Sequence, residues 1–247
     1  MNPKFSLIIP CYNEEEGIPP LAAKIAPVLT ELGQKFALEL IFVDDGSKDK
    51  TFELLNHYFG SRPDTKIICH EKNKNLGAAM RTGFAAATGD FVATMDSDCT
   101  YDPQGLVEMM KLIDDCTSIV TASPYHPRGG VENVPGYRLF LSKGITLLYR
   151  LVTGIKIHTF TALFRVYTKD VVKSVQFHSP DFLATAEVLV NAHAAGHTIR
   201  EYPAVLHVRE YGVSKIRLLR VMRSHARYLL LITPRSVARR LHLLRKK

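Results

Sequence analysis

Two aspartates separated by one residue, Asp96 and Asp98, end a short apolar run in residues 91–98, F-V-A-T-M-D-S-D. The run is rich in β-forming residues, and side chains at i and i+2 of a strand share a face. Where the strand breaks into a loop, both carboxylates can converge on one hard cation and leave its other positions to phosphate oxygens. The alternative is a pair of solvated turn residues, the usual fate of an isolated acidic pair.

Three other segments surround this pair in order. Residues 5–16, F-S-L-I-I-P-C-Y-N-E-E-E, are an apolar run that stops at Pro10 and a polar cluster that can start a helix. Residues 38–51, L-E-L-I-F-V-D-D-G-S-K-D-K-T, repeat this device, with Asp49 as the expected helix N-cap. Residues 73–87, N-K-N-L-G-A-A-M-R-T-G-F-A-A-A, predict a helix that leads into the Asp-x-Asp strand.

Strands that alternate with helices predict an α/β fold with a mostly parallel central sheet flanked by helices. Ligands of such sheets bind at the carboxyl ends of the strands. Four acids fall at these ends, namely Asp44, Asp45, Asp96 and Asp98. Their convergence favours a nucleotide site over unrelated turns.

The motifs I-P-x-Y-N-E, V-D-D-G-S-x-D-x-T, N-x-G-x-x-x-A and D-x-D, with R-E-Y-G-V-S-K at residues 209–215, resemble those of family 2 inverting glycosyltransferases. Within that family the sequence is similar to the polyprenyl-phosphate sugar transferases, the dolichyl-phosphate mannose synthase group. The resemblance runs from about residue 5 to residue 215. It implies a GT-A fold and metal-dependent, inverting transfer of a hexose from a GDP- or UDP-sugar to a dolichyl or undecaprenyl phosphate.

The resemblance also implies roles for individual residues on the donor side. Asp98 is the expected direct ligand of Mg²⁺ or Mn²⁺, and Asp96 contacts the metal or the ribose. Base and ribose are expected against Pro10, Tyr12, Glu14 and Asp45, and the donor phosphates against Arg209, Ser214 and Lys215. Other interpretations remain open: a helix cap for Glu14, a turn acid for Asp45, and a solvated charged loop for residues 209–215.

On the acceptor side the chain departs from its relatives. A phosphate acceptor is already anionic, so it needs cations rather than a general base. Pro124 stands where the lipid-phosphate enzymes have an Arg; Arg138 matches their second Arg, and Arg128 is the expected substitute for the first. Arg165 is a further acceptor-binding candidate, although a structural role under the sheet is an equal alternative.

Two other functions remain open. One is transfer to a hydroxyl of a glycan or glycolipid, which would need a base, with Glu187 or Asp181 as the candidate. The other is a non-catalytic, membrane-associated subunit of the same fold.

The chain has 247 residues and a formal net charge of +8. Residues 209–247 hold twelve Lys and Arg and one acid, so the remainder carries −3. We therefore expect a glycosyltransferase domain in residues 1–215 and a basic amphipathic helical tail in 216–247, interrupted at Pro234, which lies on an anionic membrane surface. The alternative is a helix packed on the domain with a solvated basic face.

The remaining composition fits a cytoplasmic, peripherally membrane-associated protein. Four scattered cysteines indicate reduced, buried thiols rather than disulfides. No signal peptide or run of about 18 apolar residues is recognisable. No nucleic-acid-binding module is recognisable either, and the resemblance leaves room for an integral-membrane partner subunit.

Overall fold

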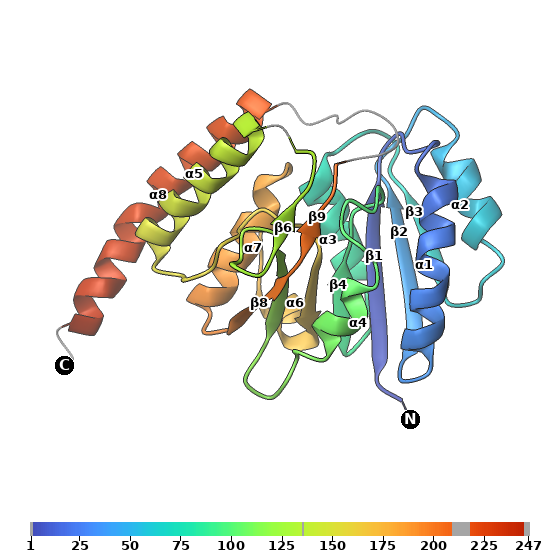
Figure 1. The fold of residues 1–247 in the computed structure, drawn as a ribbon, viewed down its shortest axis with the longest axis horizontal. Coiled ribbons are helices and arrows are strands. Elements are labelled where there is room, and N and C mark those ends of the chain that lie inside the picture. Colours follow the sequence, from blue (N-terminus) through green and yellow to red (C-terminus); the bar gives the residue numbers. More distant parts are fainter. Residues whose placement is uncertain (1, 135, 209–217, 245–247) are drawn as a thin grey trace.

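A seven-stranded sheet with helices on both faces forms the centre of the molecule (Figure 1). The computed structural model describes the backbone of residues 2–134, 136–208 and 218–244, and their side chains except those of residues 138, 218, 219 and 235–244. The strands are β1 Lys4–Cys11, β2 Ala37–Asp44, β3 Thr65–Cys69, β4 Phe91–Thr94, β5 Ile119–Ser123, β6 Gly130–Val131, β7 Arg165–Thr168, β8 Ile199–Pro203 and β9 Val205–Leu206. The helices are α1 Ile18–Gly33, α2 Thr51–Phe59, α3 Leu76–Ala86, α4 Gly105–Met110, α5 Gly136–Thr153, α6 Lys169–Ser174, α7 Leu183–Ala194 and α8 Leu218–Leu244.

The sheet order is β3-β2-β1-β4-β7-β5-β8. β7 runs antiparallel to β4 and β5, and every other pair in this sheet is parallel. The predicted α/β class with a mostly parallel sheet is therefore confirmed, and the arrangement is that of a GT-A fold. β6 and β9 form a separate parallel pair.

Alternating side chains of the strands pack on opposite faces of the sheet. In β1, Leu7 and Ile9 belong to the hydrophobic cluster that includes α1 and α4, whereas Ile8 packs on the other face with Ala79 of α3. The period of two residues in a strand explains why one apolar run serves both layers. A strand buried on both faces is the usual result of parallel pairing.

The C-terminal helix α8 lies beside α5 at one side of the molecule (Figure 1). Its buried side chains His225, Leu229 and Ile232 face the cluster formed by α5 and α7, and the Tyr149 hydroxyl and His225 Nδ1 share a hydrogen bond of 2.8 Å. Burial lowers the pKa of His225 to about 4, so this ring is neutral. The first half of α8 is thus anchored to the domain.

The predicted interruption at Pro234 is wrong. α8 is one helix from Leu218 to Leu244 with Pro234 inside it, because a proline removes one backbone hydrogen bond without necessarily ending a helix.

The predicted boundary between residues 215 and 216 lies outside the described residues, so the two-domain division stays a prediction. In the described part of the chain, no helix is long and apolar enough to cross a membrane.

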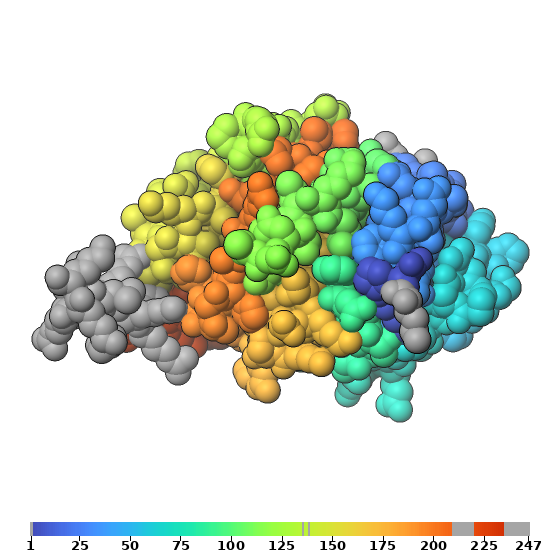
Figure 2. All heavy atoms as spheres, turned by 90° about the horizontal axis from the view of Figure 1, so that it is seen from below, coloured from blue at the N-terminus to red at the C-terminus, as the bar shows by residue number. Residues whose placement is uncertain are grey.

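The molecule viewed from below shows the N-terminal helices in blue and cyan at one end and the later elements in yellow and orange towards the other (Figure 2).

A buried carboxylate connects the strands of the N-terminal half. Glu39 of β2 accepts hydrogen bonds from Ser6 Oγ at 2.6 Å, from the Thr88 backbone N–H at 2.8 Å and from the ammonium groups of Lys4 and Lys66 at 3.0 and 2.9 Å. Burial alone would raise the pKa of Glu39, but these donors outweigh it and hold the pKa well below its usual value.

We therefore expect Glu39→Gln to lower the free energy of unfolding at pH 7 by about 1.5–3 kcal/mol, the scale of lost charge-assisted hydrogen bonds. A depressed carboxyl pKa contributes stability that is complete above the ordinary value of 4.5 and is lost as the pH falls towards the folded-state pKa. Urea unfolding at pH 7 and pH 4 would show a smaller difference between the two proteins at the lower pH. Asp64→Asn, which breaks the more exposed pair with Arg62, is the control and should cost at most about 1 kcal/mol. An equal loss at both pH values would contradict this role for the charge.

Candidate active site

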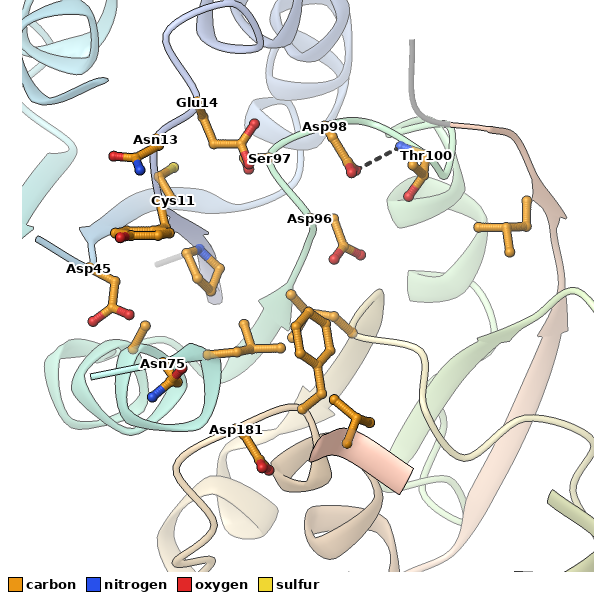
Figure 3. A pocket seen from close by; sticks show the side chains of 18 of the residues that line it. Cys11, Asn13, Glu14, Asp45, Asn75, Asp96, Ser97, Asp98, Thr100 and Asp181 are labelled. Carbon is orange, nitrogen blue, oxygen red and sulfur yellow. Dashed lines mark hydrogen bonds between the residues drawn. The ribbon is translucent and has the colours of Figure 1, made fainter. Parts of the chain in front are cut away.

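A cavity of about 890 Å³ opens at the carboxyl ends of β1, β2 and β4 (Figure 3). Loops after these three strands form one wall, and the starts of α3, α7 and α8 form the opposite one. α3 and the loop before α7 approach closely because residue 77 is glycine: a Cβ there would overlap the Ser179 carbonyl oxygen, and the Gly77 N–H donates to the Pro180 carbonyl over 2.7 Å. The cavity is large enough for a nucleotide-sized ligand.

All four residues predicted to surround the base and ribose line this cavity, namely Pro10, Tyr12, Glu14 and Asp45. Asp45 is only 3% exposed. Its Oδ1 accepts hydrogen bonds from His70 Nδ1 at 2.7 Å and from the Lys74 N–H at 2.9 Å, and His70 Nε2 in turn contacts Thr82 Oγ1 at 2.9 Å. A carboxylate accepts only, so the Nδ1 of His70 carries the proton. Asp45 is therefore held in one orientation at the cavity wall.

The loops after β1 and β2 are bonded to each other. The Asn13 N–H donates to Ser47 Oγ at 2.8 Å, and the Lys48 N–H donates to Asn13 Oδ1 at 2.8 Å. Asp44 accepts from the N–H and hydroxyl of Ser47, so this buried acid orders the turn and does not line the cavity. Gly46 has φ +70°, and a Cβ there would lie 2.5 Å from the Lys72 carbonyl carbon, so the turn requires glycine.

The predicted N-cap is shifted by one residue. α2 starts at Thr51 with Lys50 in the cap position. Asp49 nevertheless accepts the Thr51 N–H at 3.0 Å and its hydroxyl at 2.5 Å. The Thr51 oxygen then accepts the Glu14 N–H at 2.6 Å. The acid at position 49 thereby fixes the backbone of Glu14, which is 8% exposed at the cavity wall.

Asp96 and Asp98 both line the cavity, as predicted, and Figure 3 shows their carboxylates on the same side of the loop after β4. The Thr100 N–H donates to Asp98 Oδ1 at 3.2 Å. Burial raises the pKa of the adjacent Cys99 thiol to about 12.

The donor set fits a divalent cation that is only partly coordinated by protein. Among the described residues, no cluster of three or more His, Cys, Asp or Glu side chains is arranged to hold a metal. Mg²⁺ commonly takes one or two carboxylates and completes its coordination with substrate phosphates and water. Asp96 and Asp98 would hold Mg²⁺ or Mn²⁺ in this way.

The other end of the cavity is lined by Tyr125, Ser142, Asp181, His207 and Arg220, among others. Arg128, the expected substitute cation, is exposed on the loop after β5 and does not line the cavity. Arg138 lies in the first turn of α5, but its side chain is outside the described part of the structure, as are Arg209, Ser214 and Lys215 altogether. Their roles remain predictions.

Arg165 is buried in the core and not at the cavity. Its side chain is 0% exposed. The guanidinium donates to Thr121 Oγ1 at 3.0 Å, to the Phe160 carbonyl at 2.6 Å and to the Thr185 carbonyl. The structure therefore supports its structural alternative and does not support acceptor binding. The three acceptors are neutral oxygens, and the planar fork of an Arg can donate to all of them together.

Glu187 does not line the cavity either. It is 6% exposed, and its two oxygens accept the N–H groups of His178 and Ser179 at 3.1 and 2.9 Å. This carboxylate fastens the loop before α7, so the structure does not place it as a base. Asp181, the other candidate, does line the cavity.

Sequence reasoning missed His70, His207 and the cavity position of Arg220. Nothing in the spacing of His70 pointed to Asp45, because the two residues meet only through the pairing of β2 with β3. His207 is placed by its N–H bond of 2.9 Å to the Thr100 carbonyl. Arg220 was expected only as part of the basic helical tail of residues 216–247; its position just after the motif at residues 209–215 was the available signal.

Comparisons with known proteins agree with this geometry. Residues 6–176 match the model of glycosyl transferase family 2. A dolichol-phosphate mannosyltransferase of Pyrococcus furiosus is 32% identical over 87% of this chain, which spans only 59% of that relative. A polyprenol monophosphomannose synthase of Mycolicibacterium smegmatis is 30% identical, with 85% of this chain and 80% of the relative covered.

Solved structures agree on the fold. Glucosyl-3-phosphoglycerate synthase of Mycobacterium tuberculosis, solved with Mn²⁺ and UDP, superposes with a TM-score of 0.69 at 20% identity, over 93% of this chain and 79% of that one. Mannosyl-3-phosphoglycerate synthase of Rubrobacter xylanophilus gives a TM-score of 0.68 at 18% identity, over 99% and 76%. With more than half of its length matched by the family model, the chain belongs to glycosyl transferase family 2.

Proposed function

We propose that the chain transfers a hexose, with inversion, from a nucleoside diphosphate sugar to a polyprenyl phosphate at the cytoplasmic face of a membrane. One cavity supports this proposal, because it has a wall suited to the donor nucleoside and an opposite end suited to the acceptor. The edge with Asp45 and Tyr12 suits a nucleoside, and Asp96 and Asp98 lie between it and an end bordered by α5, α7 and α8. The names of the Pyrococcus and Mycolicibacterium relatives support the lipid-phosphate acceptor.

A bound Mg²⁺ or Mn²⁺ supplies a Lewis acid that neutralises the departing diphosphate. The side chains of the protein orient the donor. Asp45, held by His70, sits where it can accept an N–H of the base, and Glu14 is fixed by Thr51 beside it.

The transfer itself needs no protein base when the acceptor is a phosphate. An acceptor phosphate oxygen attacks the anomeric carbon, and the bond from this carbon to the donor oxygen breaks with its electron pair leaving on the diphosphate. Attack from the side opposite the leaving group inverts the configuration. Because the attacking oxygen is already anionic, positioning is the main requirement.

The membrane location rests on the outer surface of the α5–α8 pair. α5 exposes Phe140, Leu147 and Leu151, with exposed fractions of 78%, 56% and 61%, and α8 exposes Leu230 and Leu231. Exposed apolar side chains clustered in this way mark an interaction surface. The basic residues after position 208 would add attraction to an anionic bilayer. The exposed Leu230 and Leu231 support a role of the anchored helix in this contact.

Transfer to a hydroxyl acceptor is the second candidate function, and Asp181 supports it as a carboxylate at the cavity wall. Its Oδ2 already accepts the Ser224 hydroxyl at 2.7 Å and its Oδ1 the Leu183 N–H at 3.0 Å. A base occupied in this way is a poorer proton acceptor, which favours the phosphate acceptor. A non-catalytic role would leave the conjunction of Asp96, Asp98 and Asp45 unexplained.

Asp98→Ala is expected to lower sugar transfer by about a hundredfold or more, the scale of losing electrostatic stabilisation of a leaving group. The melting temperature should stay within a few degrees because the side chain lines a cavity. Titration with UDP and GDP, with Mn²⁺ or with EDTA, should show metal-dependent nucleotide binding in the wild type and its loss in the variant. Asp102→Ala is the matched control, since Asp102 lies in the same loop, is exposed and caps the Gln104 N–H. Wild-type turnover by Asp98→Ala would refute the metal assignment.

The double variant Phe140→Ser/Leu147→Ser is expected to bind vesicles of phosphatidylcholine and phosphatidylglycerol at least about tenfold more weakly than the wild type. Each apolar side chain that enters the interface contributes on the order of 1.5 kcal/mol. Phe52→Ser, which changes an exposed phenylalanine of α2 at the other end of the molecule, is the control and should bind like the wild type. Removal of residues 235–247 should selectively weaken binding to the anionic vesicles. Equal sedimentation of all four proteins with neutral and anionic vesicles would contradict the membrane location.

A further inference from the structure

Arg220, in the first turns of α8, borders the cavity. Among the described residues that line the cavity it is the one Lys or Arg. Five carboxylates line the same cavity, from Glu14, Asp45, Asp96, Asp98 and Asp181. A ligand that carries phosphate groups is repelled by these acids unless cations offset them, so a guanidinium at this wall has a large effect on which anions bind.

The position of Arg220 is fixed by its own helix. Ser224 follows it by four residues and lies on the same helical face, and its hydroxyl donates to Asp181 Oδ2 at 2.7 Å. One residue further, His225 is buried against Tyr149 of α5. These two contacts hold this part of α8 against α7 and α5, so Arg220 is placed at the wall by packed neighbours.

Arg220 itself is exposed to the cavity and to solvent. Within the described part of the chain its guanidinium forms no ion pair or hydrogen bond with another side chain, so its charge is available to a ligand. A guanidinium presents several N–H donors in a planar fork that matches the oxygens of a phosphate.

The place of Arg220 within the cavity favours the acceptor over the donor. Figure 3 shows Asp181, beside the start of α8, on the opposite side of the cavity from Glu14 and Asp98, with Asp96 between them. The donor nucleoside is expected along the wall of Tyr12 and Asp45. A cation on the α8 wall therefore faces the acceptor, which approaches Asp96 and Asp98 from the side opposite the donor nucleoside.

We propose that Arg220 binds the phosphate of the acceptor and is the cation that the Ser123-Pro124-Tyr125 segment does not provide. This rests on the proposed function, because it assigns the acceptor end of that site. Pro124 has no charge to offer and Arg128 lies away from the cavity. The same helix that exposes Leu230 and Leu231 then also carries the residue that receives the lipid head group, so attachment to the bilayer and capture of the acceptor are properties of one element.

The test uses the full chain and geranyl phosphate, a short acceptor that dissolves in water, with geraniol as its uncharged counterpart. Calorimetric titration of the wild type should show geranyl phosphate bound at least about tenfold more tightly than geraniol. Arg220→Gln should remove most of this difference and leave the affinities for UDP and GDP unchanged. Arg220→Lys should restore part of it, because an ammonium keeps the charge but not the fork. In sugar transfer, the KM for geranyl phosphate should rise more than kcat falls.

Arg150→Gln is the matched control, because it removes the same charge from the exposed surface of α5 without touching the cavity. Retention of the full phosphate preference by Arg220→Gln would overturn the inference and leave the proposed function standing. Loss of UDP and GDP binding with the phosphate preference intact would overturn it as well and assign Arg220 to the donor. A wild type that binds geraniol as tightly as geranyl phosphate would contradict the proposed function itself. Equal melting temperatures of the variants exclude unfolding as the cause of any loss.

Discussion

The site depends on the pairing of β1 with β2 on one side and β4 on the other. The Asp45 N–H donates to the Cys11 carbonyl at 2.8 Å, and the Met95 N–H, one residue before Asp96, donates to the Ile8 carbonyl at 3.0 Å. One strand therefore sets the positions of acids that are about fifty residues apart in the chain. A shift of either neighbour by one residue would turn its side chains to the opposite face and remove its carboxylate from the cavity.

Some acids near the cavity only hold the surrounding loops, whereas others line the cavity. Asp44, Asp49 and Glu187 accept backbone N–H or hydroxyl donors around the cavity, and each fixes a loop. Asp96 and Asp98 line the cavity itself. Buried carboxylates are stable only when donors compensate their desolvation. The structural acids thus fix the loops that surround the cavity-lining acids.

The sequence predicted the features that depend on local pattern. The apolar runs that end at Pro10 and Asp44 identified two parallel strands. Asp96 and Asp98 line the cavity, and their role in metal binding stays a prediction. Features that depend on distant partners were not predictable. Whether Arg165 binds a ligand or the core is decided by carbonyls of residues 160 and 185, which the fold alone brings together. The helical pattern of α8 identified a basic face, but not that His225 would anchor it or that Arg220 would turn towards the cavity.

We propose that this cavity binds a nucleotide sugar and a lipid phosphate together. The most direct measurement supplies the purified chain with radiolabelled UDP- and GDP-hexoses, Mn²⁺ and either a polyprenyl phosphate or the matching polyprenol, followed by extraction into organic solvent and analysis of the anomeric linkage. We predict that label enters the organic phase only with the phosphate and that the linkage is inverted relative to the donor. Transfer to the alcohol or to a saccharide, with none to the phosphate, would contradict the account.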